Sequence, residues 1–394
     1  MKKVLIFLIV LINVVFINVR AEELNILSKN AVMYNLSDNE ILYEKNSKEK
    51  IQVASLTKIM TAFVTLESKN DLNEQVIVKN EDLKGLVEEN LVTAGFTNGE
   101  VVTYRDLLYG LLLPSGADAA RILEHNVSDN FIALMNEKAK ELKLNNTSFS
   151  NSIGLDDENN YSTVEDLLEL FKEALKNEEF KKIITSKEYS TTDGKLKFKS
   201  TIQGNAKKYG IEVPYIEGGK TGTTDGAGLC LASMAKDDDI DLILITAGAL
   251  YDKIRPHHIE DAKIMYDYFI QNYSNQKVVD KTNYFKKVKT KYASLDYIKL
   301  YPERDVFKYL PNDYDKNDVL YKYEGKQIIK YNDKGKAGIL KIFYKDKLLD
   351  TQDIKISRKL KFSIKKYVSE NILFISGIIV FILLVIIILI KRVK

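Results

Sequence analysis

The stretch VASLTKIMTAF, residues 53–63, places a serine and a lysine three positions apart at the start of an apolar helical pattern. Residues i and i+3 lie on one face of a helix, so Ser55 and Lys58 would be neighbours. A serine hydroxyl is a weak nucleophile until a nearby base takes its proton. Lys58 is such a base if burial beside Ile59 and Phe63 lowers its pKa. The alternative is an N-cap serine followed by a solvated lysine, because this short pattern also occurs by chance.

A second short element, PSGAD at residues 114–118, joins two predicted helices. Its hydroxyl and carboxylate, from Ser115 and Asp118, are the groups that commonly cap a helix. Taken alone, this element therefore predicts a turn and a helix cap. It adds a second serine to the groups available for chemistry.

A third element, GGKTGT at residues 218–223, places Lys220 between glycines. A phosphate-binding P-loop fails here, because position 214, where its first glycine would stand, is occupied by proline. The glycines instead predict an edge strand that a ligand can approach closely, with Lys220 and the threonine hydroxyls presented to it. A loop with a solvated lysine is the alternative.

The composition restricts the chemistry further. The chain has 394 residues, 45% hydrophobic and 29% charged, with a net charge of +3. This balance is typical of a globular protein and gives no reason to expect a nucleic-acid partner. One cysteine, Cys230, excludes an internal disulfide, and we interpret it as a small core residue. With only three histidines, we expect no metal and no cofactor, so catalysis would fall to Ser, Lys, Asp, Glu or Tyr.

The order of elements predicts an α+β fold. Residues 31–45 read as a hairpin, and helical patterns fill much of 55–185. Short apolar runs at 228–235 and 240–250 predict buried strands, and 258–273 is helical again. We therefore expect an antiparallel sheet, with strands from both ends of the domain, flanked by a helical block.

Two helix starts carry capping-box patterns. Thr103 with Asp106 predicts the beginning of a helix that ends before Pro114. Ser162 with Glu165 predicts the beginning of the helix in VEDLLELFKEALK.

Both ends of the chain predict membrane targeting. Residues 1–21 have a basic start and an apolar run that ends in Val-Arg-Ala, as in a cleaved signal peptide; an uncleaved anchor is the alternative. Residues 372–390 are 19 uncharged residues, close to the roughly 20 that span a bilayer. The basic residues before this span would by charge alone face the cytoplasm. The signal peptide predicts the opposite orientation, and we follow it because long segments are exported largely regardless of charge. We therefore expect the body of the protein to be exported and the basic stretch to lie on an anionic outer surface.

Taken in order, the three short elements resemble the S-x-x-K, S-x-N and K-T-G elements of penicillin-binding proteins and serine β-lactamases. FSNSIGLDDENNYSTVEDLLEL, residues 149–170, resembles the F-x-N-x-x-G-L-D…Y-S-T-x-x-D stretch of the D-alanyl-D-alanine carboxypeptidases, the low-molecular-mass penicillin-binding proteins. KTGTTDGAGLCLASMA, residues 220–235, is similar to their K-T-G-x-T-x-x-A-G-x-x-L-x-x-S-A segment. The resemblance covers residues 24–275.

The resemblance implies a role for each matching residue. Ser55 is the implied acylated nucleophile, Lys58 its general base, and Ser115 the relay of a proton to the leaving amine. Lys220 is implied to keep Lys58 neutral and to attract the substrate carboxylate.

Further residues are implied to bind substrate. Thr221, Gly222 and Thr223 flank it, with the backbone N–H groups of Ser55 and Thr223 as an oxyanion hole. Arg255 is the implied partner of the terminal carboxylate, where a bidentate contact favours arginine; a surface arginine before a proline is the alternative.

Two positions depart from the family pattern. Ala117 stands where the family usually has Asn, so an amide that would hold the peptide and Lys58 is missing. Ile153 stands where His often precedes Gly-Leu-Asp. We expect peptide positioning and turnover to differ from those of relatives.

The resemblance implies a serine-type carboxypeptidase. It would remove the terminal D-alanine from peptidoglycan stem peptides ending in D-Ala-D-Ala, and β-lactams would acylate the same serine. The alternatives are a β-lactamase or transpeptidase on the same fold, or a wall-binding relative whose catalysis is weakened or lost, which the alanine at position 117 would favour. The expected regions are a signal peptide (1–21), a catalytic domain (22–275), a small all-β domain (276–356), a basic linker (357–371), a transmembrane helix (372–390) and a cytoplasmic tail (391–394).

Overall fold

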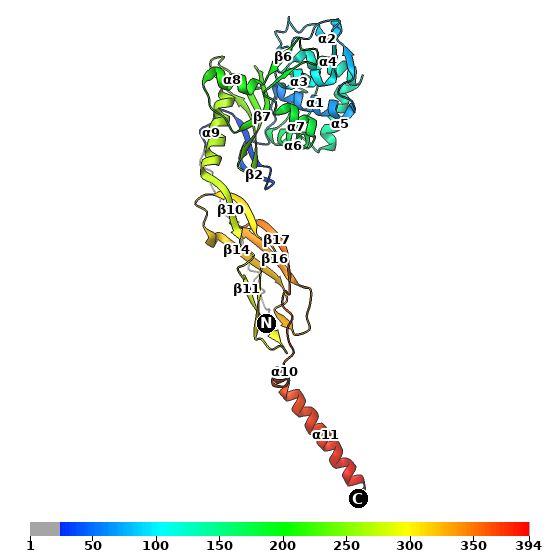
Figure 1. Ribbon diagram of the computed structural model, residues 1–394, viewed down its shortest axis with the longest axis vertical. Coiled ribbons are helices and arrows are strands. Elements are labelled where there is room, and N and C mark those ends of the chain that lie inside the picture. Colours follow the sequence, from blue (N-terminus) through cyan, green and yellow to red (C-terminus); the bar gives the residue numbers. More distant parts are fainter. Residues whose placement is uncertain (1–23, 394) are drawn as a thin grey trace, which may run out of the picture. The chain divides into compact units, whose positions relative to one another are not determined.

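A computed structural model describes residues 24–393, so the predicted signal peptide lies outside the described residues. The chain divides into two units between residues 271 and 272 (Figure 1). The first unit holds the three short elements of the sequence, and we describe each unit by itself.

The first unit is built on a five-stranded antiparallel sheet with the order β2-β1-β9-β8-β7. Its strands come from both ends of the unit, as the sequence predicts. The glycine-flanked strand β7 lies at one edge, which confirms the predicted edge strand. The strands are β1 (Asn30–Asn35), β2 (Glu40–Lys45), β7 (Ile216–Thr224), β8 (Gly228–Asp237) and β9 (Ile240–Ala249).

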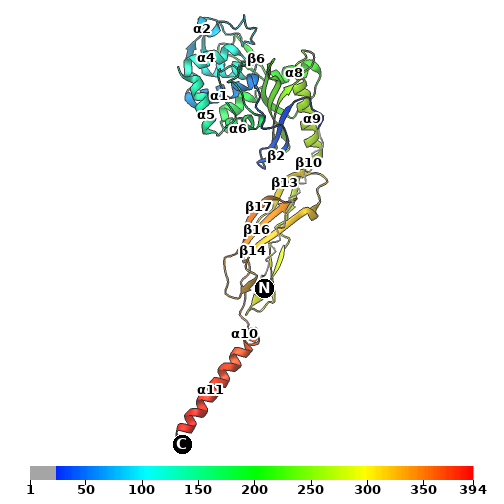
Figure 2. The same ribbon diagram turned by 180° about the vertical axis from the view of Figure 1, so that it is seen from behind.

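Helices cover both faces of this sheet (Figures 1 and 2). On one face, alternate residues of β8 and β9, among them Ala232 and Ile245, pack into a core shared with the helical block. On the other face, Ser233 and Tyr266 of α9 exchange a hydrogen bond. The helices are η1 (Ala54–Leu56), α1 (Thr57–Ser68), α2 (Asn80–Leu83), α3 (Tyr104–Leu112), α4 (Ala117–Val127), α5 (Phe131–Glu141), α6 (Val164–Ala174), α7 (Glu178–Ile184), α8 (Thr201–Tyr209) and α9 (His257–Asn272). Two small two-stranded antiparallel sheets complete the unit: β3 (Gln75–Ile77) with β4 (Val101–Thr103), and β5 (Glu188–Ser190) with β6 (Lys197–Lys199). The predicted α+β class is confirmed.

The two predicted helix starts differ in outcome. Thr103 and Asp106 form the expected capping box at α3. The prediction for α6 is wrong by one residue, because Thr163 is its N-cap and accepts from the backbone N–H of Asp166. The Ser162 hydroxyl is instead bonded to Thr147, away from the helix start.

The second unit is a set of small sheets around its own apolar core. The prediction that this region is built from β-strands is thus confirmed. Its strands are β10 (Tyr273–Val279), β11 (Lys286–Lys291), β12 (Tyr297–Leu300), β13 (Val306–Pro311), β14 (Val319–Gly325), β15 (Ile328–Lys330), β16 (Lys336–Tyr344) and β17 (Lys347–Lys355), with η2 (Lys316–Asp318) before β14. Two helices follow, α10 (Ile364–Glu370) and α11 (Ile372–Val393). Residues 372–392 of α11 are long and apolar enough to cross a membrane.

Candidate active site

Ser55 lies in η1, immediately before α1. The Lys58 amine donates to the Ser55 hydroxyl at 2.9 Å, so the two side chains meet as their spacing predicts. The preceding residue, Ala54, has φ +47°, in the left-handed region that residues with a Cβ seldom adopt. Such strain persists where the surroundings enforce it, often at functional sites.

A glycine from a distant segment holds this strained start. A Cβ on Gly154 would lie 1.9 Å from the carbonyl oxygen of Ala54, and Gly154 itself has φ +92°. Only glycine fits both the conformation and the contact. The Gly-Leu-Asp part of the 149–170 segment therefore packs directly behind Ser55.

Lys58 is almost completely buried, with 1% of its surface exposed. Burial lowers its pKa to about 7, while the nearby Asp118 carboxylate acts in the opposite direction. The direction agrees with the expectation from the sequence. A lysine with this pKa is partly neutral at neutral pH and is able to accept a proton.

Ser115 lies at the junction of α3 and α4 with φ +70°. The Lys220 amine donates to its hydroxyl at 2.8 Å and to the carbonyl of Thr221 at 2.6 Å. Burial, and next the positive charge of Lys58, hold the pKa of Lys220 well below its ordinary value. A positive charge on Lys58 thus disfavours a second positive charge on Lys220.

The edge strand β7 approaches Ser55 closely. A Cβ on Gly222 would lie 3.0 Å from the backbone nitrogen of Ser55 and 3.1 Å from the Cβ of Ala54. The hydroxyl of the neighbouring Thr221 lies 2.7 Å from that of Thr201 on α8. Glycine at 222 thus permits the strand and the nucleophile to lie side by side.

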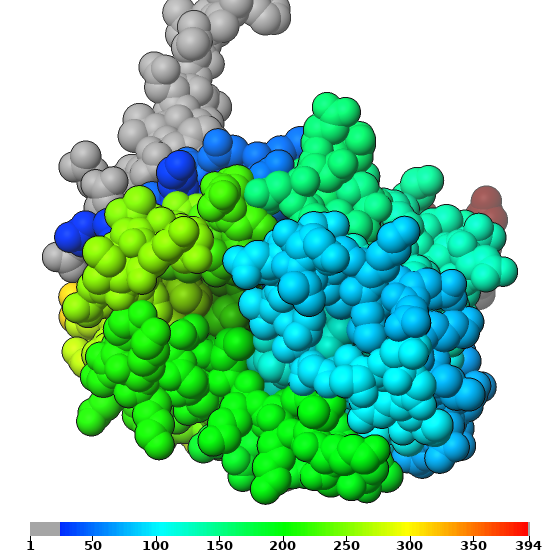
Figure 3. All heavy atoms as spheres, turned by 90° about the horizontal axis from the view of Figure 1, so that it is seen from above, coloured from blue at the N-terminus to red at the C-terminus, as the bar shows by residue number. Residues whose placement is uncertain are grey.

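Most of these residues border a cavity of about 300 Å³, whereas the fully buried Lys220 is not among its lining residues in the described chain. From above, the surface is hollowed where the green part of the chain meets the cyan and blue part (Figure 3). The predicted residues in its lining are Ser55, Lys58, Ser115, Thr221, Gly222 and Thr223. The sequence did not single out the lining residues Asn90, Leu91, Val92, Thr201 and Asn205. They carry no distinctive pattern, and only the fold brings them to the cavity.

Asp118 has a structural role that its position in the sequence does not reveal. Its carboxylate accepts from the backbone N–H groups of Ala94, Gly95 and Phe96 at 2.7, 2.9 and 3.1 Å. Gly116 is the N-cap of α4, and it makes no side-chain cap bond. Asp118 therefore ties the segment that follows Asn90–Val92 to the start of α4.

Two other residues of the sequence analysis lie apart from this cavity. Arg255 is exposed and paired with Glu260, and it is not among the cavity's lining residues in the described chain. Cys230 is fully buried in β8, and burial raises the pKa of its thiol to about 12, which leaves it unreactive.

Comparison with known proteins shows which family this chain resembles. The family model described as D-alanyl-D-alanine carboxypeptidase matches residues 17–250. D-alanyl-D-alanine carboxypeptidase DacF of Bacillus subtilis is 30% identical over 309 residues, which cover 76% of this chain and 77% of the relative. The D-alanyl-D-alanine carboxypeptidase of Streptomyces sp. strain K15 is 33% identical over 211 residues, which cover 49% of this chain and 71% of the relative.

Two solved structures of similar proteins share the fold of this chain. The Streptomyces K15 DD-transpeptidase, 30% identical, covers 62% of this chain and 97% of its own, with a TM-score of 0.55. Penicillin binding protein 5 of Haemophilus influenzae, 22% identical, shares the fold over 85% of this chain and 98% of its own, with a TM-score of 0.62.

The chain belongs to the D-alanyl-D-alanine carboxypeptidase family. It is, at the level of the family, a serine hydrolase of the carboxypeptidase type.

Proposed function

We propose that this chain removes the terminal D-alanine from peptidoglycan stem peptides through an acyl-enzyme on Ser55. The observation that carries the proposal is the 2.9 Å contact between the hydroxyl of Ser55 and the buried amine of Lys58. A nucleophile within hydrogen-bond reach of a base is the arrangement that acyl transfer requires. β-Lactams, which carry a reactive amide, would acylate the same oxygen.

In the first step, neutral Lys58 takes the proton of Ser55 while the serine oxygen attacks the carbonyl carbon of the D-Ala-D-Ala bond. That bond breaks, and the leaving amine receives a proton from Ser115. The proton that Lys58 took replaces the one that Ser115 gives, so Lys58 is neutral again. Lys220 donates to Ser115, so the two groups form a short path for this proton. Water then attacks the ester, with Lys58 again as base, and releases the shortened peptide.

The substrate would lie as an extra strand along β7. Its terminal carboxylate would lie beside Lys220 and Thr221, where positive charge is available. The backbone N–H groups of Ser55 and Thr223 would stabilise the charge that develops on the carbonyl oxygen. The close approach of Gly222 to the nitrogen of Ser55 supports this arrangement.

Arg255 would need to leave Glu260 before it could bind the carboxylate. We propose that it does so when substrate is present. Replacement by lysine keeps the charge and removes the bidentate contact, so Arg255→Lys should raise KM for the peptide. An unchanged KM would remove Arg255 from the site.

Transpeptidation is the second candidate, because one similar solved structure is that of the Streptomyces K15 DD-transpeptidase. The two reactions share the acyl-enzyme and differ in whether water or an amine attacks it. Products from a D-Ala-D-Ala peptide, with and without an added amine acceptor, would separate them. A β-lactamase would instead release a bound penicillin within seconds.

We further propose an extracellular catalytic domain held to the cell membrane by α11, after export directed by residues 1–21. The helix is long and apolar enough for this role. Residues 276–356 would serve as a spacer, and the basic stretch 357–371 would lie on anionic headgroups. Protease added outside intact cells should then digest the catalytic domain, and full protection would contradict this topology.

The direct test of the proposed activity is D-alanine release from a D-Ala-D-Ala tripeptide by the wild type and by Ser55→Ala. The wild type should release D-alanine and bind labelled penicillin, and the variant should do neither. If the wild type does neither, the proposal is wrong.

A further inference from the structure

A backbone turn at residues 151–155 positions the lysine beside Ser55. The carbonyl oxygen of Ile153 accepts from the amine of Lys58 at 2.7 Å. The preceding carbonyl, that of Ser152, accepts from the hydroxyl of Thr61 at 2.7 Å. Lys58 and Thr61 lie on one face of α1, about one helical turn apart, so two consecutive carbonyls of the 151–155 turn bind two side chains on that face.

The inner side of this turn is fixed by its own side chains and backbone. The Asn151 side-chain oxygen accepts from the backbone N–H groups of Ile153, Gly154 and Leu155. Gly154 is packed against the carbonyl of Ala54. A movement of the turn would therefore displace both the base and the backbone next to the nucleophile.

The outer side of the turn is held by one carboxylate. The Ser152 hydroxyl donates to Glu124 at 2.5 Å, and Ser152 is itself fully buried. Glu124 lies on α4, seven residues after Ala117, which lines the catalytic cavity. One helix thus contacts the cavity at its start and the back of the turn two helical turns later.

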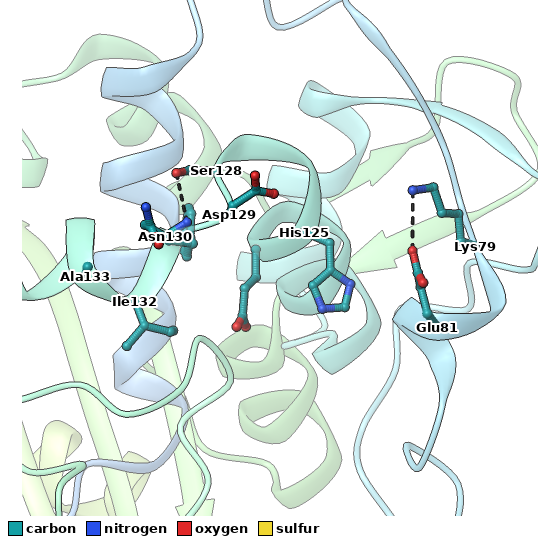
Figure 4. A pocket seen from close by; sticks show the side chains of 10 residues that line it. Lys79, Glu81, His125, Ser128, Asp129, Asn130, Ile132 and Ala133 are labelled. Atoms are coloured by element: carbon teal, nitrogen blue, oxygen red, sulfur yellow. Dashed lines mark hydrogen bonds and ion pairs between the residues drawn. The ribbon is translucent and has the colours of Figure 1, made fainter.

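Glu124 lines a separate depression of about 730 Å³, which solvent reaches from outside the catalytic cavity. Figure 4 shows His125, Ser128 and Asp129 around it, with Lys79 and Glu81 paired at one side. Glu81 lines the same depression, but it is paired with Lys79 and not with the turn. It therefore provides a matched control for Glu124.

We propose that Glu124 is a positioning residue, which fixes the Ser152–Ile153 turn from behind and thereby holds Lys58 against Ser55. The inference rests on the proposed function, since it concerns the base of that reaction. It gives Glu124, outside the catalytic cavity, a role in the rate of acylation.

The absence of an amide at position 117 makes this contact more consequential. Alanine has no group to accept from Lys58, and the described partners of its amine are Ser55 and the carbonyl of Ile153. Of these two partners, Ser55 reacts and the carbonyl of Ile153 does not. The turn therefore holds Lys58 in place throughout the reaction. A charge-assisted hydrogen bond such as that from Ser152 to Glu124 is stronger than a neutral one, and it restrains the turn accordingly.

Acylation of the full chain by a chromogenic β-lactam, measured from pH 5 to pH 10, tests the proposal. Glu124→Ala should lower the second-order rate constant about 10- to 100-fold, the range expected for a small misplacement of a reacting group. It should also move the pH midpoint, because Lys58 loses part of its fixed environment. Glu124→Gln, whose side-chain oxygen still accepts from Ser152, should restore most of the rate. Glu81→Ala should match the wild type.

Ser152→Ala removes the other half of the contact. If the two groups act through one hydrogen bond, the double variant should be no slower than the slower single variant. Additive losses, a Glu124→Ala variant with wild-type rate and midpoint, or a loss that Glu124→Gln does not restore, would each overturn the proposal.

Should Glu124→Ala fail to fold, Glu124→Gln and Ser152→Ala decide the same question. If the wild type itself is not acylated while it folds normally, the proposed function fails instead.

Discussion

The amine of Lys58 donates to the backbone carbonyl of Ile153 at 2.7 Å, although the two residues are 95 positions apart in the sequence. A second acceptor for the base is thus supplied by a main-chain turn. Ala117, which lines the same cavity, has no polar side chain to offer. This arrangement explains how the lysine can be held without an amide at position 117.

Ala117→Asn would add such an amide to the cavity. We expect a gain of about 2- to 13-fold in kcat/KM for D-Ala-D-Ala peptides, which corresponds to one hydrogen bond of about 0.5–1.5 kcal/mol. Ala117→Leu adds volume without an amide and should give no gain. Steady-state D-alanine release measures both, and equal effects of the two substitutions would argue against the explanation.

The acylation rate should depend on the protonation of Lys58. Only the neutral amine accepts the proton of Ser55, and burial lowers the pKa to about 7. The rate should therefore rise as pH increases through 7 and level off above it. Lys58→Arg, which stays charged, should lose about 10²- to 10⁴-fold, the usual contribution of a general base. A rate that is flat from pH 5 to pH 9 would exclude Lys58 as that base.

Asp118 shifts this pH dependence. Its negative charge raises the pKa of Lys58 against the effect of burial. In Asp118→Asn the pKa of Lys58 should fall, so the midpoint of the acylation profile should move to lower pH. Asp129→Asn, the same change at an exposed carboxylate, is the control and should leave the midpoint in place. A midpoint that moves upward in Asp118→Asn would contradict the assignment.

Gly154→Ala should destabilise the protein and slow acylation. The added Cβ would meet the carbonyl of Ala54 at 1.9 Å, beyond the cost of φ +92° itself, which is about 1–3 kcal/mol. Gly194→Ala is matched in backbone strain, with φ +73°, but its Cβ would meet nothing within 4 Å. Urea unfolding should therefore show a larger loss for Gly154→Ala. Equal losses would mean that the packing behind Ser55 tolerates movement.

Much of the fold follows from local patterns in the sequence. The apolar runs at 228–235 and 240–250 lie in β8 and β9, and the glycines around Lys220 lie on an edge strand. These features depend on residues close in sequence. The predicted start of α6 is wrong because Ser162 and Thr163 both resemble caps. Thr163 accepts from the backbone N–H of Asp166, while the Ser162 hydroxyl is bonded to the more distant Thr147.

The contacts around the site mostly join residues far apart in the sequence, so no local sequence pattern predicts them. Asp118 resembles a helix cap in the sequence, yet its carboxylate binds a segment more than 20 residues earlier. The pairing of Glu124 with Ser152 and the packing of Gly154 on Ala54 likewise depend on how distant segments meet. The resemblance to the family identified the reacting side chains, whereas the residues that position those side chains could be found only from the fold.

The central claim is that Ser55 carries the acyl group. Intact-mass spectrometry after incubation with benzylpenicillin, followed by peptide mapping, tests it most directly. We predict one adduct with the mass of the drug on the peptide that contains Ser55, and none in Ser55→Ala. An adduct on another residue, or an unchanged adduct in Ser55→Ala, would contradict the claim.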